Sequence, residues 1–231
     1  KYDLIKNIST QFYDFTPSED GIDKGKANRL LSDFRKAVGS SLIEDEADKR
    51  EAKKKADEQR AIEDAKRSKN ERLQELKNKF LALYSATDKQ RRGFDLEELF
   101  FELLELEEFE CTPPYKNTGE QIDGHFKYEK FDYLVEIRWR DEPAGQSDLS
   151  VFDGKIRGKG QSTRGFLLSI NGFNKNGISK FSGDAPRIIL MDGQDFFLVF
   201  EERTTFYDLM KLKTDFLARK GDVYVNYGNR T

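Results

Sequence analysis

The stretch from Gly119 to Arg140 carries acidic and basic side chains in a spacing that suits metal and phosphate chemistry. We expect two short strands here, with Asp123 just after the apolar Ile122 and Glu136 and Arg138 on the second strand. Side chains alternate between the two faces of a strand, so Glu136 and Arg138 share one face. A carboxylate beside a cation, opposite a second carboxylate from the neighbouring strand, suggests a site for a divalent cation and a phosphate.

The composition limits the kinds of protein that this chain can form. Of its 231 residues, 36% are hydrophobic and 36% are charged, which predicts that part of the chain is extended and solvated. The 19 phenylalanines are enough to build a core in the rest. A net charge of −3 means that nucleic-acid binding would need a local basic patch.

Single Cys and His residues narrow the chemistry further. Cys111 and His125 exclude an internal disulfide framework, a cysteine-based zinc site and a multi-histidine metal site. A lone Cys fits a reducing compartment, and no apolar run approaches the ~20 residues of a membrane span, so we expect a cytoplasmic protein. No signal peptide is visible, and the first residue, Lys1, indicates that the chain starts inside a longer protein.

The chain divides into three expected regions. Residues 1–43 form a small helical N-terminal segment, residues 44–88 a long charged helix or linker, and residues 89–231 an α/β domain. In the first region, apolar residues recur with helical spacing from Ala27 to Val38, and Gly39 is expected to end that helix.

The second region is rich in helix-forming charged residues. From Glu44 to Arg72 it has no Gly, Pro or aromatic residue. Leu73, Leu76, Phe80 and Leu83 have a 3-4-3 spacing, but the same register carried backwards meets lysines and a glutamine, so a continuous coiled coil fails. Two interpretations remain open: a solvated helix whose apolar end docks on the C-terminal domain, or a helix that pairs with a partner.

The third region alternates helical and strand patterns. We expect a buried helix after Gly93, a strand ending at Pro113–Pro114, the two strands described above, and a helix capped by Ser147 or Asp148. Buried strands follow at 164–171 and 187–192, then a turn at Asp192–Gly193 leading into the apolar run 196–200, a helix over about 205–220 and a short last strand at 223–225. The apolar run 187–192 predicts burial on both faces, hence helices on both sides of a mixed sheet.

Five pieces of this region appear in an order that resembles a known family. They are Leu96–Phe100, Gln121–Gly124, Leu134–Trp139, Arg164–Gly172 and Ile189–Gly193. Together they resemble the Mrr-like restriction endonucleases of the PD-(D/E)xK nuclease superfamily. The resemblance covers about residues 90–200 and none of residues 1–88. It implies a three-layer core, with a mixed central sheet flanked by helices.

The resemblance also implies a reaction and a site. It implies hydrolysis of DNA with Mg²⁺, with Mn²⁺ as a substitute, in a prokaryotic restriction or anti-phage defence system. Asp123, Glu136 and the carbonyl of Ile137 would supply metal ligands, which agrees with the preference of Mg²⁺ for oxygen. Glu97 matches the helix glutamate that many family members place near the metal, and Glu98 is the adjacent alternative.

Arg138 departs from the family pattern, which has a lysine at this position. Arginine can hold a phosphate bidentately but does not accept a proton at ordinary pH. Lys155, on the following helix, could replace the missing lysine, as in family members that have relocated it. The alternative is a catalytically weak or inactive nuclease-fold subunit that binds DNA or scaffolds a larger complex. An RNA-directed nuclease is a third hypothesis.

Each candidate residue also has a plain structural explanation. Asp123 could be a turn residue before Gly124, Glu136 could form an ion pair with Arg138 or a nearby lysine, and Glu97 could lie on a solvated acidic face. His125 is expected to be structural.

The run after the fourth expected helix could contact phosphates or could be an ordinary solvated connection. Its basic residues are Lys155, Arg157, Lys159 and Arg164. For partners we expect DNA, a homodimer or higher oligomer, since cutting both strands calls for two active sites, and a protein partner of the N-terminal helices. We expect no membrane.

Overall fold

The computed structural model describes residues 24–117, 120–183 and 185–228. The chain forms two compact units, Lys1–Lys66 and Arg67–Thr231. The three-region division expected above, 1–43, 44–88 and 89–231, remains a prediction. Within the described residues, no helix is long and apolar enough to cross a membrane.

Helix α2 (Lys24–Leu83) is the longest element and spans 60 residues. It runs through Gly39, so our expectation that this glycine ends a helix was wrong. The cost of a glycine in a helix interior, about 1 kcal/mol relative to alanine, is small beside the summed propensity of the charged run that follows. The last turns of α2 belong to the second unit, where Leu73, Leu76, Phe80 and Leu83 are buried. This burial confirms the docking of its apolar end.

The second unit is built on a five-stranded mixed sheet, ordered β1-β4-β5-β6-β7. Its strands are β1 (Cys111–Thr112), β4 (His125–Tyr128), β5 (Phe131–Arg138), β6 (Thr163–Ser169) and β7 (Ile188–Asp192). β1, β4 and β5 pair antiparallel, whereas β5, β6 and β7 are parallel. A separate two-stranded ribbon pairs β2 (Tyr115–Asn117) with β3 (Glu120–Ile122).

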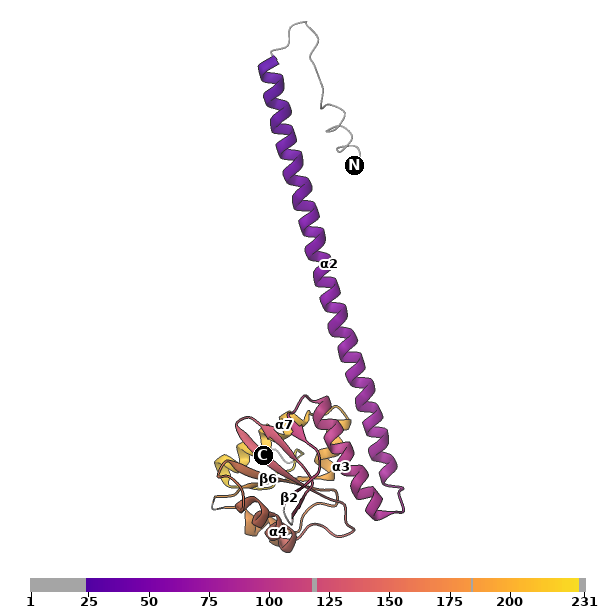
Figure 1. The fold of residues 1–231 in the computed structure, drawn as a ribbon, viewed down its shortest axis with the longest axis vertical. Coiled ribbons are helices and arrows are strands. Elements are labelled where there is room, and N and C mark those ends of the chain that lie inside the picture. The colour runs from indigo at the N-terminus through magenta and orange to yellow at the C-terminus, as the bar shows by residue number, and fades with distance from the viewer. Residues whose placement is uncertain (1–23, 118–119, 184, 229–231) are drawn as a thin grey trace. The chain divides into compact units, whose positions relative to one another are not determined.

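Helices cover both faces of this sheet, as expected from the apolar β7 (Figure 1). α4 (Gln146–Arg157) connects the parallel strands β5 and β6 and packs on one face. α3 (Lys89–Leu106), α6 (Gly193–Phe200) and α7 (Phe206–Lys220) pack on the other face through a cluster of phenylalanine rings. α5 (Lys175–Phe181) lies against α4. The predicted three-layer core is confirmed.

Three local expectations differ from the structure. The expected turn at Asp192–Gly193 is the start of helix α6, which contains the apolar run 196–200. Asp192 caps this helix, because its side chain accepts a hydrogen bond from the Asp195 N–H at 2.8 Å. The C-terminal segment forms only an isolated bridge between Tyr224 and Leu190, not a strand. The N-cap of α4 is Gly145, not Ser147 or Asp148.

Candidate active site

Strand β5 places Glu136 on the face of the sheet that α4 covers. Leu134 pairs with Gly165 in β6, and the missing side chain of Gly165 is the point where α4 approaches. Glu136 is two residues beyond Leu134, so its side chain lies on the same face. It is only 7% exposed, which makes its charge costly unless cations or a metal compensate it.

Asp123 lies two residues before β4 and extends the hydrogen-bonded pairing with β5 past the first residue of that strand. The Val135 N–H donates to the carbonyl of Gly124 at 2.8 Å. The next inward N–H, that of Ile137, donates to Asp123 Oδ2 at 3.0 Å, so a carboxylate replaces a backbone acceptor. Burial raises the pKa of Asp123, and the Ile137 N–H opposes this shift. The side chain is therefore fixed beside Glu136 and is more than a turn residue.

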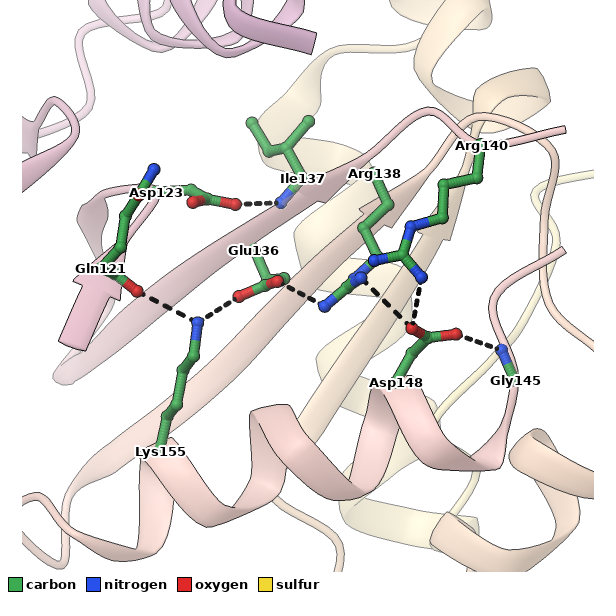
Figure 2. Close-up of polar contacts among 9 residues, drawn as sticks. All are labelled: Gln121, Asp123, Glu136, Ile137, Arg138, Arg140, Gly145, Asp148 and Lys155. Carbon is green, nitrogen blue, oxygen red and sulfur yellow. Dashed lines mark hydrogen bonds and ion pairs between the residues drawn. The ribbon is translucent and has the colours of Figure 1, made fainter. Parts of the chain in front are cut away.

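Lys155 reaches the same carboxylate from helix α4. Its Nζ lies 2.8 Å from Glu136 Oε2 and also donates to the carbonyl of Gln121 at 3.0 Å (Figure 2). The reach depends on Gly165, because a Cβ there would lie 2.3 Å from Cδ1 of Ile156 on α4. The close seating of α4 on β6 thus brings Lys155 to Glu136.

Arg138 lies between two carboxylates. Its Nη2 donates to Glu136 Oε1 at 2.7 Å, and its Nη1 lies 3.2 Å from Asp148 Oδ1. Asp148 also binds Arg140 at 2.9 Å and accepts the Gly145 N–H at 2.9 Å, which fixes the start of α4. Figure 2 shows the resulting row of alternating charges, from Lys155 through Glu136, Arg138 and Asp148 to Arg140.

Glu97 on α3 adds a third carboxylate near the first two. Its half-buried side chain has a pKa raised to about 7 by burial, then by the charges of Asp123 and Glu136. Its neighbour Glu98 is exposed, so the structure favours Glu97 over Glu98 as the residue facing the site. The arrangement can do two things: the carboxylates offer oxygen ligands, and the cations attract a phosphate.

One family model matches the part of the chain that contains this site. Residues 89–199 match the family model of the Mrr catalytic domain, described as a restriction endonuclease. This part of the chain is therefore similar to the Mrr-like restriction endonucleases. The matched residues contain all four elements that build the site, α3, β4, β5 and α4. A comparison with curated proteins gave no match.

Three solved structures are similar to the chain. AF1548, described as a protein of unknown function, is 17% identical with a TM-score of 0.39, covering 55% of this chain and 78% of that chain. The DNA modification-dependent restriction endonuclease AspBHI is 15% identical with a TM-score of 0.40, covering 65% and 40%. The restriction endonuclease MspJI, in complex with a 27-mer oligonucleotide, is 12% identical with a TM-score of 0.37, covering 64% and 36%. The chain thus spans less than half the length of the last two proteins.

The oxygen donors of this Mrr-like domain fit Mg²⁺. Asp123 and Glu136 offer carboxylates and Ile137 a backbone carbonyl, and Mg²⁺ uses one or two carboxylates with water and substrate phosphate. The charge of Glu136 raises the pKa values of both Asp123 and Glu97, so a bound cation would relieve this repulsion. No group of three or more His, Cys, Asp or Glu side chains among the described residues is arranged to hold a metal. The fit therefore rests on two carboxylates and not on a closed cage.

The basic residues of the run 155–164, which begins in the last turn of α4, are not gathered on one surface of the Mrr-like domain. Lys155 points to Glu136, whereas Arg157 Nε pairs with Asp153 Oδ2 at 2.6 Å. Arg164 pairs in register with Tyr133, on the opposite face of the sheet, and its guanidinium lies 3.5 Å from the ring centre of Phe131. Lys159 is half-buried near the end of the helix.

Glu136, His125 and Asp148 each form an ion pair that bears on the expectations from the sequence. The ion pair proposed as the plain explanation of Glu136 is present, with both Arg138 and Lys155. His125 pairs with Asp132 at 2.9 Å, which fits a structural role. Asp148 was expected only as a helix cap, and no sequence signal links it to Arg138, because the sheet and the α4 crossover bring them together.

Proposed function

We propose that the Mrr-like domain is a Mg²⁺-dependent DNA endonuclease that hydrolyses phosphodiester bonds at the Glu136 site. One observation carries the proposal: Lys155 meets Glu136 at 2.8 Å, beside Asp123 and within the electrostatic reach of Glu97. Separate elements of the fold thus bring carboxylates and a lysine together at one site. Members of the family typically use divalent metal ions, and the donor set described above suits Mg²⁺, with Mn²⁺ as a substitute.

Asp123, Glu136 and the carbonyl of Ile137 would hold the ion. When bound, Mg²⁺ supplies polarisation of the phosphoryl oxygen and a lower pKa for the attacking water. Asp123 is fixed for this role by the Ile137 N–H, and Glu136 is held between two cations. Glu97 would add negative charge beside the ligands and can accept a hydrogen bond from water.

Lys155 and Arg138 have different roles in the proposed site. Lys155 carries a compact ammonium that can donate to a phosphate oxygen or hold the attacking water. Arg138 is engaged by Glu136 and Asp148, so its main effect is to fix the carboxylate. This division explains how the site can function without a lysine at position 138.

Replacing Glu136 tests the proposal directly. Glu136→Ala should abolish Mg²⁺-dependent cleavage of a supercoiled plasmid, because it removes a metal ligand and the partner of both cations. Glu136→Gln keeps the shape of the side chain and should lose activity to a similar extent. Gel analysis of nicked and linear products, with circular dichroism to show retained folding, measures the effect.

Glu98→Ala is the matched control, because Glu98 is an exposed glutamate in the same domain. It should cleave like the unchanged protein. Cleavage that survives both Glu136 replacements would refute the site assignment.

A specific observation favours a second candidate, a nuclease-fold subunit that binds DNA or scaffolds a complex without cutting. Both oxygens of Glu136 already have cationic partners, Oε1 with Arg138 and Oε2 with Lys155. A metal ion has to displace or share one of them. Calorimetric titration of Mg²⁺ or Mn²⁺ separates the candidates, because a subunit without a metal site gives no heat that depends on Asp123.

We also propose a substrate class, an assembly and a biological role. The substrate class is DNA, and paired DNA and RNA substrates test it. Cleavage of both strands calls for two active sites, so we propose a homodimer or higher oligomer, with the N-terminal helices as an assembly surface for a second copy or a protein partner. The prokaryotic restriction or anti-phage role follows from the family alone.

A further inference from the structure

A small recess between α4 and α5 gathers basic side chains that the proposed site does not use. It has a volume of about 290 Å³. Arg157 comes from α4, Lys180 from α5, and Arg187 from the segment that enters β7. Three parts of the chain thus bring positive charge to one concave place.

The charges in this recess are not balanced by its described residues. Asp153 is the one carboxylate among the described residues that line it, and it pairs with Arg157. No carboxylate among the described residues forms an ion pair with Lys180 or Arg187, and both side chains are exposed.

Uncompensated cations converging on a recess favour an anionic ligand, because each lowers its own electrostatic free energy when a negative charge binds. The hydroxyl of Ser150 and the guanidinium groups supply hydrogen-bond donors that suit phosphate oxygens. A neutral or apolar ligand would leave these charges uncompensated.

The place of the recess relative to the active site identifies the source of the phosphate. Arg157 follows Lys155 by two residues on α4, which turns it about 200° around the helix. Arg157 and the proposed catalytic lysine therefore lie on opposite sides of α4, which is about 10–12 Å across. A DNA strand whose scissile phosphate lies at Glu136 can present a phosphate a few nucleotides away at this distance.

We propose that the recess of Arg157, Lys180 and Arg187 binds a backbone phosphate of the DNA substrate outside the cleavage site. The inference rests on the proposed DNA endonuclease function and assigns two contacts, Lys180 and Arg187, outside the basic run 155–164. It also gives Asp153 a role, because this carboxylate reduces the positive charge of the recess.

Binding measured without cleavage tests the inference. Fluorescence anisotropy of a labelled duplex, in EDTA and over a series of salt concentrations, gives the affinity and its salt slope. Lys180→Gln/Arg187→Gln should weaken binding at low salt by about tenfold or more. It should also reduce the slope of log affinity against log salt by about 0.9, the value for one phosphate contact. Asp153→Asn should strengthen binding.

The matched control is Lys130→Gln/Lys211→Gln, which removes two exposed lysines outside the recess. Its salt slope should not change. An equal loss in both double variants, or no loss in the first, would overturn the inference. The inference would also be overturned if inorganic phosphate competed in a way that depends on Lys180 and Arg187, while the salt slope of DNA binding did not depend on them.

The two proposals fail in different ways. If the unchanged protein binds DNA with the predicted dependence on Lys180 and Arg187 but does not cleave it, the recess stands and the endonuclease does not. If it cleaves and the double variant has an unaltered slope, the recess fails alone. If it does not bind DNA at all, both fail.

Discussion

Asp148 joins Arg138 and Arg140 to the first turn of α4, and this one side chain sets the position of the arginine that holds Glu136. In Asp148→Asn, the ionic contact with Arg138 is lost while an oxygen remains to accept the Gly145 N–H. We expect kcat for cleavage of a short duplex to fall by about tenfold, which is about 1.4 kcal/mol of activation free energy. KM should change little, because Asp148 acts through Arg138 and not on the substrate.

Two further variants distinguish positioning from a loss of stability. Asp148→Glu should restore part of kcat, because it restores the charge. Asp215→Asn removes an ion pair of similar type on α7, with Arg219, and should leave both kinetic constants unchanged. A fall in kcat that only follows the fraction of folded protein would contradict the positioning role.

Glu97 makes stability depend on pH. Its pKa rises from 4.5 when the chain is unfolded to about 7 in the folded protein, so folding favours the protonated form. The stability that this preference contributes is fully present below about pH 4.5 and is lost as the pH rises through about 7. Glu97→Gln should therefore gain stability relative to the unchanged protein over this range, by roughly 1–2 kcal/mol after allowance for partial exposure.

Urea unfolding in EDTA at several pH values measures this difference. The chelator matters because a bound divalent ion would favour the charged carboxylate. A difference between the two proteins that does not vary with pH would refute the assignment of the titration to Glu97.

At the scale of elements, α2 contributes to the core of the second unit through its last turns. Phe80 has no exposed surface, and its ring lies 5.4 Å from that of Phe196 and 5.3 Å from that of Phe200. Phe80→Ala should lower the free energy of unfolding of this unit by about 3–5 kcal/mol, through lost transfer energy and the cavity left behind. The fluorescence of the single tryptophan, Trp139, which lies against Phe80, follows the unfolding transition.

Ile62→Ala is the control on the same helix, because Ile62 is 62% exposed. Its effect should stay within about 0.5 kcal/mol. Comparable losses in the two variants would mean that the apolar end of α2 does not form part of the core.

The elements that could be predicted are those whose signal is local. The periodic helices and the apolar strands β6 and β7 follow from the spacing and apolar character of their residues alone. The apolar run 196–200 was harder to assign, because five apolar residues fit a strand or a buried helix equally well. The N-cap at Asp192 favours the helix, and the run lies in α6.

At the scale of the molecule, the sequence predicted the core and the proximity of Asp123 and Glu136 better than it predicted their surroundings. Asp123, two residues before β4, lies close to Glu136 because β4 and β5 form one hairpin and the Ile137 N–H donates to Asp123. The contact of Lys155 with Glu136 requires the whole α4 crossover, and Asp148 was missed for the same reason. The buried pair of Lys213 and Asp195, 2.6 Å apart, was also missed, since nothing in a helical pattern distinguishes a buried lysine from a solvated one.

Gly165 has a consequence for genetic experiments on this protein. It carries no charge and touches no substrate in the proposed mechanism, yet the helix that supplies Lys155 and Asp148 rests directly on it. Any side chain there would push α4 outward and separate the lysine from its carboxylate. A screen for loss of cleavage would therefore recover Gly165 among the acidic and basic residues, and a ranking by phenotype alone would mistake a spacing requirement for a chemical one.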